Sequence, residues 1–283
     1  MNIDTKSVLK KFNLHPSKSL GQNFLTDGEI LEVIASAAEP GKEDLILEIG
    51  PGLGSLTAEL AESAGKVVAV EIDRRLIPVL KENLRGYSNI TIINGDILRM
   101  DVKKELGTLS ASSIKVVANL PYYITTPVVM KLLESGIGAK TMVFMVQKEV
   151  ADRMKAPPGG KDYGALSVAV QYYSRPSVIM EVPPDCFIPR PDVYSSVVRL
   201  DIFEEPPVEL YDRDLFFKVV KAAFGQRRKT LVNALNNAGY IDAGKEMIKE
   251  ILQRMGIEEN QRGETLSVSQ FARLANELNK LNK

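Results

Sequence analysis

The chain has 283 residues, 45% hydrophobic and 25% charged, which is typical of a soluble globular protein of about two domains. The formal net charge is zero, so any surface for a polyanionic partner must be local. The single cysteine, Cys186, excludes an internal disulfide and a thiolate metal cluster, and the single histidine, His15, argues against most zinc sites and Ser-His triads. With no apolar run of membrane-spanning length and no signal-peptide pattern, we expect a cytoplasmic protein that works without a metal.

Residues 1–19 are polar and carry four lysines against one aspartate, so we interpret them as a basic arm or a solvated tail. Asp27 is placed to cap a helix that extends to Ala38, and Pro40-Gly41 ends that helix. The predicted strands and turns with candidate binding residues follow this helix in the chain.

The first of these elements is a strand, a glycine turn and a helix. Residues 45–49 are predicted to form a buried strand, Gly50-Pro51-Gly52-Leu53-Gly54 follows directly, and residues 55–64 have a helical pattern. Glycines let the backbone approach a ligand closely, and a helix N-terminus offers unpaired N–H groups. A tight turn between a strand and a helix also favours glycine, and the dinucleotide fingerprint would need a third glycine at Ser55, so the turn alone indicates only a nucleotide-binding unit.

The next two predicted strands both end in acidic residues. Residues 66–72 include Glu71 and precede Asp73, where a carboxylate is well placed to bind a ribose diol. Residues 89–94 are followed by Gly95-Asp96, whose carboxylate could accept from an adenine amino group while Ile97 packs on the ring. One acidic strand end is usually a helix cap, but two in succession after a glycine turn favour a nucleoside site.

The fourth predicted strand, 115–118, is short and β-branched and ends before Pro121. It delivers Asn119 and the Leu120 carbonyl to the carboxyl edge of the sheet, where open α/β folds bind ligands. Two acceptors converging on one point suit an amino group, and Tyr122 could stack on the ring that carries it. The alternative is a proline turn with a capping asparagine and core tyrosines.

The remaining elements alternate as far as a proline-rich boundary. We predict helices at 127–133, 148–155 and 164–173, and strands at 141–146, 177–181 and 193–203. Between the last two strands, a stiff proline-rich loop at 182–192 either presents Phe187 to a ligand or tucks it onto the core.

Beyond Glu204-Glu205-Pro206-Pro207 the pattern is helical, with helices at 215–224, 227–237, 245–255 and 268–278. This predicts a first domain at 1–206 and a second at 207–283. Ser267 and Gln270 form a capping box for the last helix. Arg227, Arg228 and Lys229 stand at a predicted helix start, where cations oppose the macrodipole, and therefore indicate an external anion or a solvated helix end.

Taken together, these stretches resemble the motif set of S-adenosylmethionine-dependent methyltransferases that act on an amino nitrogen: Glu48-Ile-Gly-Pro-Gly-Leu-Gly54, Glu71, Gly95-Asp96 and Asn119-Leu-Pro-Tyr122. Three stretches resemble the ribosomal RNA adenine N6,N6-dimethyltransferases more closely: Gly21-Gln-Asn-Phe-Leu25, Asn119-Leu-Pro-Tyr-Tyr-Ile124 and Phe187-Ile-Pro-Arg-Pro191. Two more resemble the bacterial small-subunit enzymes in particular: Gln226-Arg-Arg-Lys-Thr230 and Arg262-Gly-Glu-Thr-Leu-Ser267. The resemblance runs from about Ser19 to the C-terminus.

The resemblance implies an α/β fold, with a Rossmann-like methyltransferase sheet of seven strands, one of them an antiparallel edge, and a small C-terminal all-helical domain. Domain 1–206, with its basic arm at 1–19, would bind S-adenosylmethionine and carry catalysis, and domain 207–283 would dock RNA. Gly50 and Gly52 would line the methionine part of the cofactor, Glu71 would bind its ribose and Asp96 its adenine. The remaining implied cofactor residues are Asn23, Leu25, Ile72, Ile97 and Asn119.

For the acceptor, the resemblance implies that Asn119 and the Leu120 carbonyl grip the target N6, that Pro121 shapes this turn, and that Tyr122 and Phe187 sandwich the base. Two weak acceptors would favour the pyramidal amine and disperse charge during in-line attack on the sulfonium methyl, with no strong base. The base must leave its stack to reach the site.

The implied substrate is a pair of adjacent adenines in a hairpin near the 3′ end of small-subunit ribosomal RNA, each methylated twice, with S-adenosylhomocysteine as the other product. The implied RNA contacts are Arg227, Arg228 and Lys229, and the implied partner is the immature small ribosomal subunit. We expect a monomer with no metal and no membrane association.

Several alternatives remain open. A large-subunit dimethyltransferase of the macrolide-resistance type shares the catalytic motifs but is disfavoured by the stretches after Gln226. A DNA adenine methyltransferase lacks support because nothing resembles a separate base-reading domain. A catalytically silent nucleic-acid-binding relative is disfavoured by Glu71, Asp96 and Asn119, and a nicotinamide dehydrogenase by Ser55 and the absence of a histidine in the core motifs.

Overall fold

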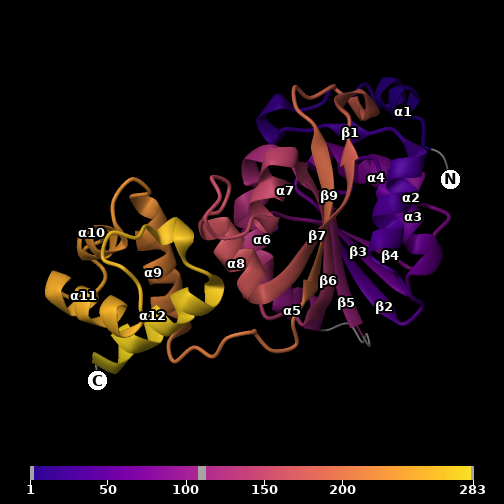
Figure 1. Cartoon of the computed structure of the whole chain (residues 1–283). Coiled ribbons are helices and arrows are strands. Elements are labelled where there is room, and N and C mark those ends of the chain that lie inside the picture. The colour runs from indigo at the N-terminus through magenta and orange to yellow at the C-terminus, as the bar shows by residue number, and fades with distance from the viewer. Residues whose placement is uncertain (1–2, 108–112, 282–283) are drawn as a thin grey trace. The chain divides into compact units, whose positions relative to one another are not determined.

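The computed structural model describes residues 3–107 and 113–281, so the first two residues of the expected arm lie outside the described part. The chain forms two compact units. The first contains the residues up to Ala151 together with Pro176–Ile202, and the second contains Asp152–Arg175 and Phe203–Lys283. Figure 1 shows the helices and strands of both units.

The first unit is built on a seven-stranded sheet of order β4-β3-β2-β5-β6-β9-β7. The strands are β2 (Asp44–Ile49), β3 (Lys66–Glu71), β4 (Ile90–Asn94), β5 (Ser113–Asn119), β6 (Ala139–Gln147), β7 (Ser174–Val182) and β9 (Ser195–Ile202). The strands from β2 to β6 pair in parallel, and β9 runs antiparallel to β6. The expected α/β sheet is confirmed, but the reversed strand β9 lies between β6 and the edge strand β7, one place inside the expected edge.

Helices cover the sheet because its central strands are apolar on both faces, and β2 and β3 are almost completely buried. Figure 1 shows α2 (Gly28–Ala37) and α3 (Ser55–Ser63) on one side of the sheet and α6 (Thr125–Glu134) on the other. Asp27 caps α2 as expected, accepting from the N–H groups of Glu29 and Ile30. The other helices of this unit beyond its N-terminal segment are η2 (Arg74–Leu76), α4 (Ile77–Asn83), α5 (Val102–Gly107), η3 (Tyr122–Ile124) and η4 (Pro184–Cys186). Helix α7 (Lys148–Lys155) crosses into the second unit.

The N-terminal segment is folded onto the first unit, so its interpretation as a basic arm or solvated tail was wrong. It contains α1 (Thr5–Lys11), η1 (Lys18–Leu20) and the short strand β1 (Phe24–Leu25). Five apolar side chains of the segment pack against a buried cluster that includes Phe24 and Leu53: Ile3, Val8, Leu9, Phe12 and Leu14. Lysines dominate the composition of this segment. The interspersed apolar residues nevertheless hold it against the first unit, because packing them there removes apolar surface from water.

The second unit is helical and has its own buried core. Its elements are α8 (Ala165–Tyr173), α9 (Arg213–Gly225), α10 (Leu231–Asn236), α11 (Lys245–Arg254), η5 (Gly263–Thr265) and α12 (Val268–Leu281). The unit also takes in 152–175, which the expected boundary at 206 assigned to the catalytic domain, because Tyr163, Val168 and Tyr172 belong to this helical core. In the described residues, no helix combines the length and the apolar character needed to cross a membrane.

The caps of the second unit show where its helices begin. The capping box is confirmed, because Gln270 accepts from the Ser267 N–H and the Ser267 hydroxyl accepts from the Gln270 N–H. The helix expected to begin at Arg227 instead begins at Leu231, with Thr230 as its cap. Arg227 therefore follows the end of α9, where cations suit the macrodipole, and the argument that the cluster opposes a helix dipole was wrong.

Candidate functional site

A cavity of about 300 Å³ lies at the carboxyl edge of the parallel strands in the first unit. Its size is at the lower end of the range for small-molecule sites. It forms there because β2, β3, β4 and β5 are parallel neighbours, so the residues that follow each of them meet at one edge of the sheet. Every candidate residue that belongs to this unit lines the cavity: Asn23, Leu25, Gly50, Gly52, Glu71, Ile72, Asp96, Ile97, Asn119, Leu120, Pro121, Tyr122 and Phe187.

The glycine turn between β2 and α3 forms one wall. Gly50, Gly52 and Gly54 all have positive φ, the region that side chains other than glycine rarely adopt. A Cβ on Gly52 would lie 3.2 Å from the Phe24 ring, and one on Gly50 would lie 3.7 Å from the Asn119 carbonyl oxygen. The turn therefore needs glycine both for its backbone and for the close approach of neighbouring groups.

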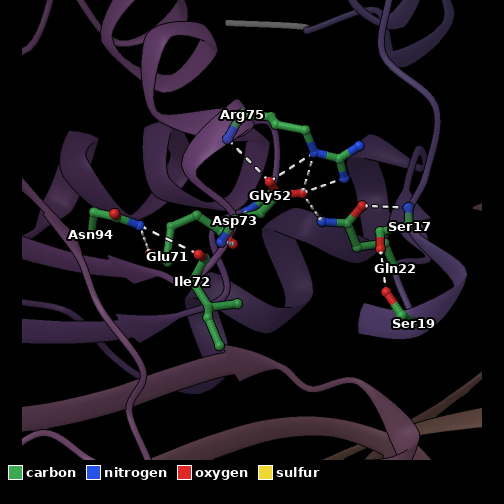
Figure 2. Close-up of polar contacts among 9 residues, drawn as sticks. All are labelled: Ser17, Ser19, Gln22, Gly52, Glu71, Ile72, Asp73, Arg75 and Asn94. Carbon is green, nitrogen blue, oxygen red and sulfur yellow. Dashed lines mark hydrogen bonds and ion pairs between the residues drawn. The ribbon is translucent and has the colours of Figure 1, made fainter.

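Glu71 stands at the end of β3 and is almost completely buried (Figure 2). Its Oε1 accepts from the Asp73 N–H at 2.7 Å, and its Oε2 accepts from the Gly52 N–H at 3.3 Å. Burial raises the pKa of Glu71, and these two backbone donors oppose the increase. The carboxyl group thus joins the end of β3 to the glycine turn while it faces the cavity.

The end of β4 supplies a half-exposed carboxylate and apolar neighbours. Asp96 accepts from the Leu98 N–H at 2.9 Å and forms an exposed ion pair with Arg99 at 3.4 Å. Ile97 is buried, whereas Ile72 is 50% exposed at the same cavity. An exposed isoleucine beside a carboxylate provides an apolar surface and an acceptor, which is what a flat heterocycle with an amino group requires.

Asn119 ends β5, which neighbours β2 on the side away from β3, and lines the same cavity. Its side-chain nitrogen donates to the main-chain carbonyl of Asn23 at 3.4 Å, which leaves Oδ1 as an acceptor. Proline at 121 ends the strand, and the Pro121 carbonyl accepts from the Ile124 N–H at 3.2 Å, so η3 follows immediately.

Two aromatic rings complete the acceptor side of the cavity. The hydroxyl of Tyr122 lies 2.8 Å from the hydroxyl of Ser195 on β9, and burial raises the pKa of Tyr122. Phe187 was expected in a stiff loop that either presents it to a ligand or tucks it onto the core. It lies in the short strand β8 (Phe187–Ile188), opposite Leu25 of β1. It is buried in a core cluster and also lines the cavity, and its strand pairs with β1 in a separate two-stranded sheet.

Glu48 also lines the cavity, although sequence reasoning assigned it no role. It is 1% exposed, and its Oε2 has no hydrogen-bond partner among the described residues. Burial raises the pKa of Glu48 to about 8, with a smaller contribution from the nearby Glu71. A single acidic residue inside the otherwise apolar strand 45–49 was the available signal. A buried carboxyl with an unused oxygen suits a ligand that carries positive charge.

The three cationic candidates belong to the second unit and differ from one another. The Arg227 guanidinium donates to the carbonyls of Lys161 and Tyr163, at 2.8 and 3.1 Å, and pairs with Glu264 at 3.2 Å. Arg228 and Lys229 are exposed. Arg227 is therefore committed to contacts inside its own unit, whereas the exposed pair is free of that constraint.

Comparison with known proteins gives one consistent result. The sequence model of the family described as ribosomal RNA adenine dimethylase matches residues 13–280. Ribosomal RNA small subunit methyltransferase A of Alkaliphilus oremlandii is 52% identical over 277 residues, which cover 98% of this chain and 96% of that protein.

Two solved structures also resemble this chain along most of its length. A dimethyladenosine transferase from Plasmodium falciparum is 27% identical, covers 92% of this chain and 98% of its own, and has a TM-score of 0.79. The 23S rRNA methyltransferase ErmE is also 27% identical, covers 90% of this chain and 99% of its own, and has a TM-score of 0.68.

Proposed function

Because the chain belongs to the ribosomal RNA adenine dimethylase family, we propose that it transfers methyl groups from S-adenosylmethionine to N6 of two adjacent adenines in a hairpin near the 3′ end of small-subunit ribosomal RNA. The single observation that carries the proposal is that Asn119 and Glu71 share one cavity with the glycine turn. An acceptor for an amine and a site for a nucleoside cofactor therefore lie side by side.

The cavity suits S-adenosylmethionine in three respects. The glycine turn leaves room where a Cβ on Gly52 would crowd the Phe24 ring. Glu71 and Asp96 offer carboxylates for a ribose and an adenine amino group, and the orphaned Oε2 of Glu48 suits a cationic group. When bound, this cofactor supplies a methyl group activated by a positively charged sulfur.

Asn119 acts on the target amine by accepting a hydrogen bond from its N–H group. An exocyclic adenine nitrogen shares its lone pair with the ring and is a poor nucleophile. An acceptor on one N–H, with the Leu120 carbonyl on the other, favours the pyramidal form and disperses the positive charge that develops during attack. Since the Asn119 amide donates to the Asn23 carbonyl, its oxygen is already oriented as an acceptor, which reduces the reorganisation needed for reaction.

The second methylation uses fewer contacts than the first. After one transfer the target nitrogen has a single N–H, so only one of the two acceptors can be engaged. The rings of Tyr122 and Phe187 then hold the base in place by stacking, and the Ser195 hydroxyl fixes the Tyr122 side chain through its phenolic oxygen. The target base leaves its stack to enter this site.

The helical unit would dock the RNA, with Arg228 and Lys229 as phosphate contacts. Arg227 would support them indirectly by ordering residues around Lys161. The substrate is expected to be the immature small subunit, met in the cytoplasm by a monomeric enzyme. The proposal includes no metal.

A methylation assay tests the substrate. The purified chain would be incubated with S-adenosylmethionine labelled in the methyl group and either small subunits that lack the dimethyladenosines or protein-free large-subunit RNA. We expect up to four methyl groups per small subunit, because two adenines each accept two, and background incorporation into the large-subunit RNA. The reverse preference would favour the second candidate, a large-subunit enzyme like ErmE, with which this chain shares 27% identity.

A further inference from the structure

The N-terminal segment forms one wall of the cofactor cavity through residues 20–25. We call residues 17–25 the strap. The strap carries β1, whose Leu25 pairs with Phe187, and its Phe24 packs in the buried cluster with Leu53. The strap therefore contacts both sides of the cavity. The contacts that hold the strap in place are expected to affect the binding of both the cofactor and the target base.

Three consecutive strap residues contact the two sides. The Tyr123 ring covers Gly21, where an added Cβ would lie 3.1 Å from that ring. Gln22 bonds to Asp73 beside the β3 end, and the Asn23 carbonyl accepts from the Asn119 amide. The middle contact joins the strap to the ribose side, and the outer two join it to the acceptor side.

Both polar atoms of the Gln22 side chain form a hydrogen bond (Figure 2). Its Nε2 donates to Asp73 Oδ2 at 3.0 Å, and its Oε1 accepts from the Ser17 N–H at 2.8 Å. Gln22 therefore joins the strap both to Ser17, its first residue, and to Asp73 at the edge of the sheet. Neither bond can form if the amide is turned over, since a donor would then face a donor and an acceptor an acceptor.

Asp73 is a rigid anchor for this bond. The Arg75 side chain contacts both of its oxygens, and the Arg75 N–H donates to its Oδ1 at 3.0 Å. Arg75 lowers the pKa of Asp73, so the anchor is an ionised acceptor. The Asp73 N–H in turn donates to Glu71, which links the anchor to the proposed ribose carboxylate through a single residue.

We propose that Gln22 is a positioning residue that locks the strap over the cavity and so couples cofactor binding to the orientation of the Asn119 amide. The inference rests on the proposed function. With the lock in place, the Asn23 carbonyl stays where it holds the Asn119 nitrogen, and Oδ1 stays turned toward the amine. Without it, the strap moves away from the β3 corner and both the cofactor wall and the acceptor lose their support.

Two substitutions that together leave the net charge unchanged test the role of Gln22. In Gln22→Glu the donor to Asp73 is lost and two carboxylates face each other, so we expect S-adenosylhomocysteine to bind about tenfold more weakly by titration calorimetry. In the double variant Gln22→Glu/Asp73→Asn the asparagine nitrogen can donate to the glutamate, and the Ser17 N–H keeps its acceptor. In the double variant the bond between positions 22 and 73 is restored with its direction reversed, while Arg75 loses its acceptor at Oδ2. We therefore expect the double variant to bind more tightly than the sum of the two single-variant losses predicts. Gln253→Glu, on the exposed side of α11, is the matched control.

Two further readouts separate positioning from a general loss of fold. Trypsin should cut after Lys18 faster in Gln22→Glu than in the original chain without any cofactor, and the double variant should reverse this. Turnover with RNA should fall in Gln22→Glu even at saturating cofactor, because Asn119 is then less well held.

Two results would overturn the inference: unchanged affinity, turnover and proteolysis in Gln22→Glu, or simple addition of the two single-variant losses in the double variant. Failure of the proposed function would look different, because the original chain itself would then bind no cofactor or methylate no small subunits.

Discussion

At the scale of single residues, loss of the Asn119 side chain is expected to affect methyl transfer much more than cofactor binding. Asn119 lines the cavity, and its side-chain nitrogen donates to the Asn23 carbonyl. We expect Asn119→Ala to lower kcat by at least 100-fold, the usual loss when one preorganised polar group at a reacting centre is removed. Binding of S-adenosylhomocysteine, measured by calorimetry, should weaken by less than tenfold. Full activity in this variant would refute the role assigned to the asparagine.

Glu48 predicts a dependence of stability on pH. Burial raises its pKa from 4.5 to about 8, so between these values the folded protein keeps a proton that the unfolded chain releases. The stabilising contribution is therefore complete below about pH 4.5 and is lost as the pH rises through 8. Glu48→Gln cannot ionise, so relative to the original chain its stability should gain about 4 kcal/mol between pH 5 and pH 9.

The measurement for Glu48 is urea unfolding without cofactor at both pH values, followed by circular dichroism, with amide hydrogen exchange in β2 assigning the transition to the first unit. A constant difference between variant and original chain at the two pH values would show that the carboxyl is ionised in the fold throughout. Because the unused Oε2 suits a cationic ligand, the same variant should also bind S-adenosylmethionine more weakly.

At the scale of elements, the turn between β2 and α3 depends on a glycine in contact with the strap. In Gly52→Ala the φ of +60° is strained for a side chain, and the new Cβ would stand 3.2 Å from the Phe24 ring. We expect about 1–2 kcal/mol of lost stability and a tenfold loss of cofactor affinity, measured by thermal unfolding and calorimetry. Gly86→Ala is the control, since its Cβ would have no atom within 4 Å, and an equal effect there would exclude the turn as the cause.

At the scale of the molecule, we expect two neighbouring cations of the second unit to have different roles, Arg227 in stability and Arg228 in RNA binding. Arg227 makes three contacts within the unit, so Arg227→Ala should lower its stability by about 1–2 kcal/mol by thermal unfolding. Arg228→Ala should leave stability within about 0.5 kcal/mol, because its exposed side chain does not share the contacts that Arg227 makes within the unit.

The same pair of variants is distinguished by RNA affinity at several salt concentrations. Arg228→Ala should reduce the slope of log affinity against log salt by about 1, as expected when one phosphate contact is lost. An unchanged slope in Arg228→Ala would remove it from the interface. A loss of stability in Arg228→Ala as large as that in Arg227→Ala would show that both cations are structural.

The sequence by itself determined the chemistry at the strand ends. A short apolar strand, the turn after it and the side chain at its end are adjacent in the chain, so the order of residue types was enough to assign Glu71, Asp96 and Asn119 to one sheet edge. Local rules also identified the caps at Asp27 and Ser267. These features were predictable because each depends on only a few neighbouring residues and on the two periodicities of helix and strand.

Only the tertiary structure decided which distant segments meet. Gln22 and Asp73 are 51 residues apart, and neither shows by its neighbours that it contacts the other. Phe187, expected in a loop, pairs with Leu25 in a short two-stranded sheet. Scattered apolar residues pack the N-terminal segment against the first unit, and Tyr163 belongs to the helical core of the second. Such outcomes depend on how whole surfaces fit and exclude water, and a linear pattern of residue types does not encode that fit in any single stretch.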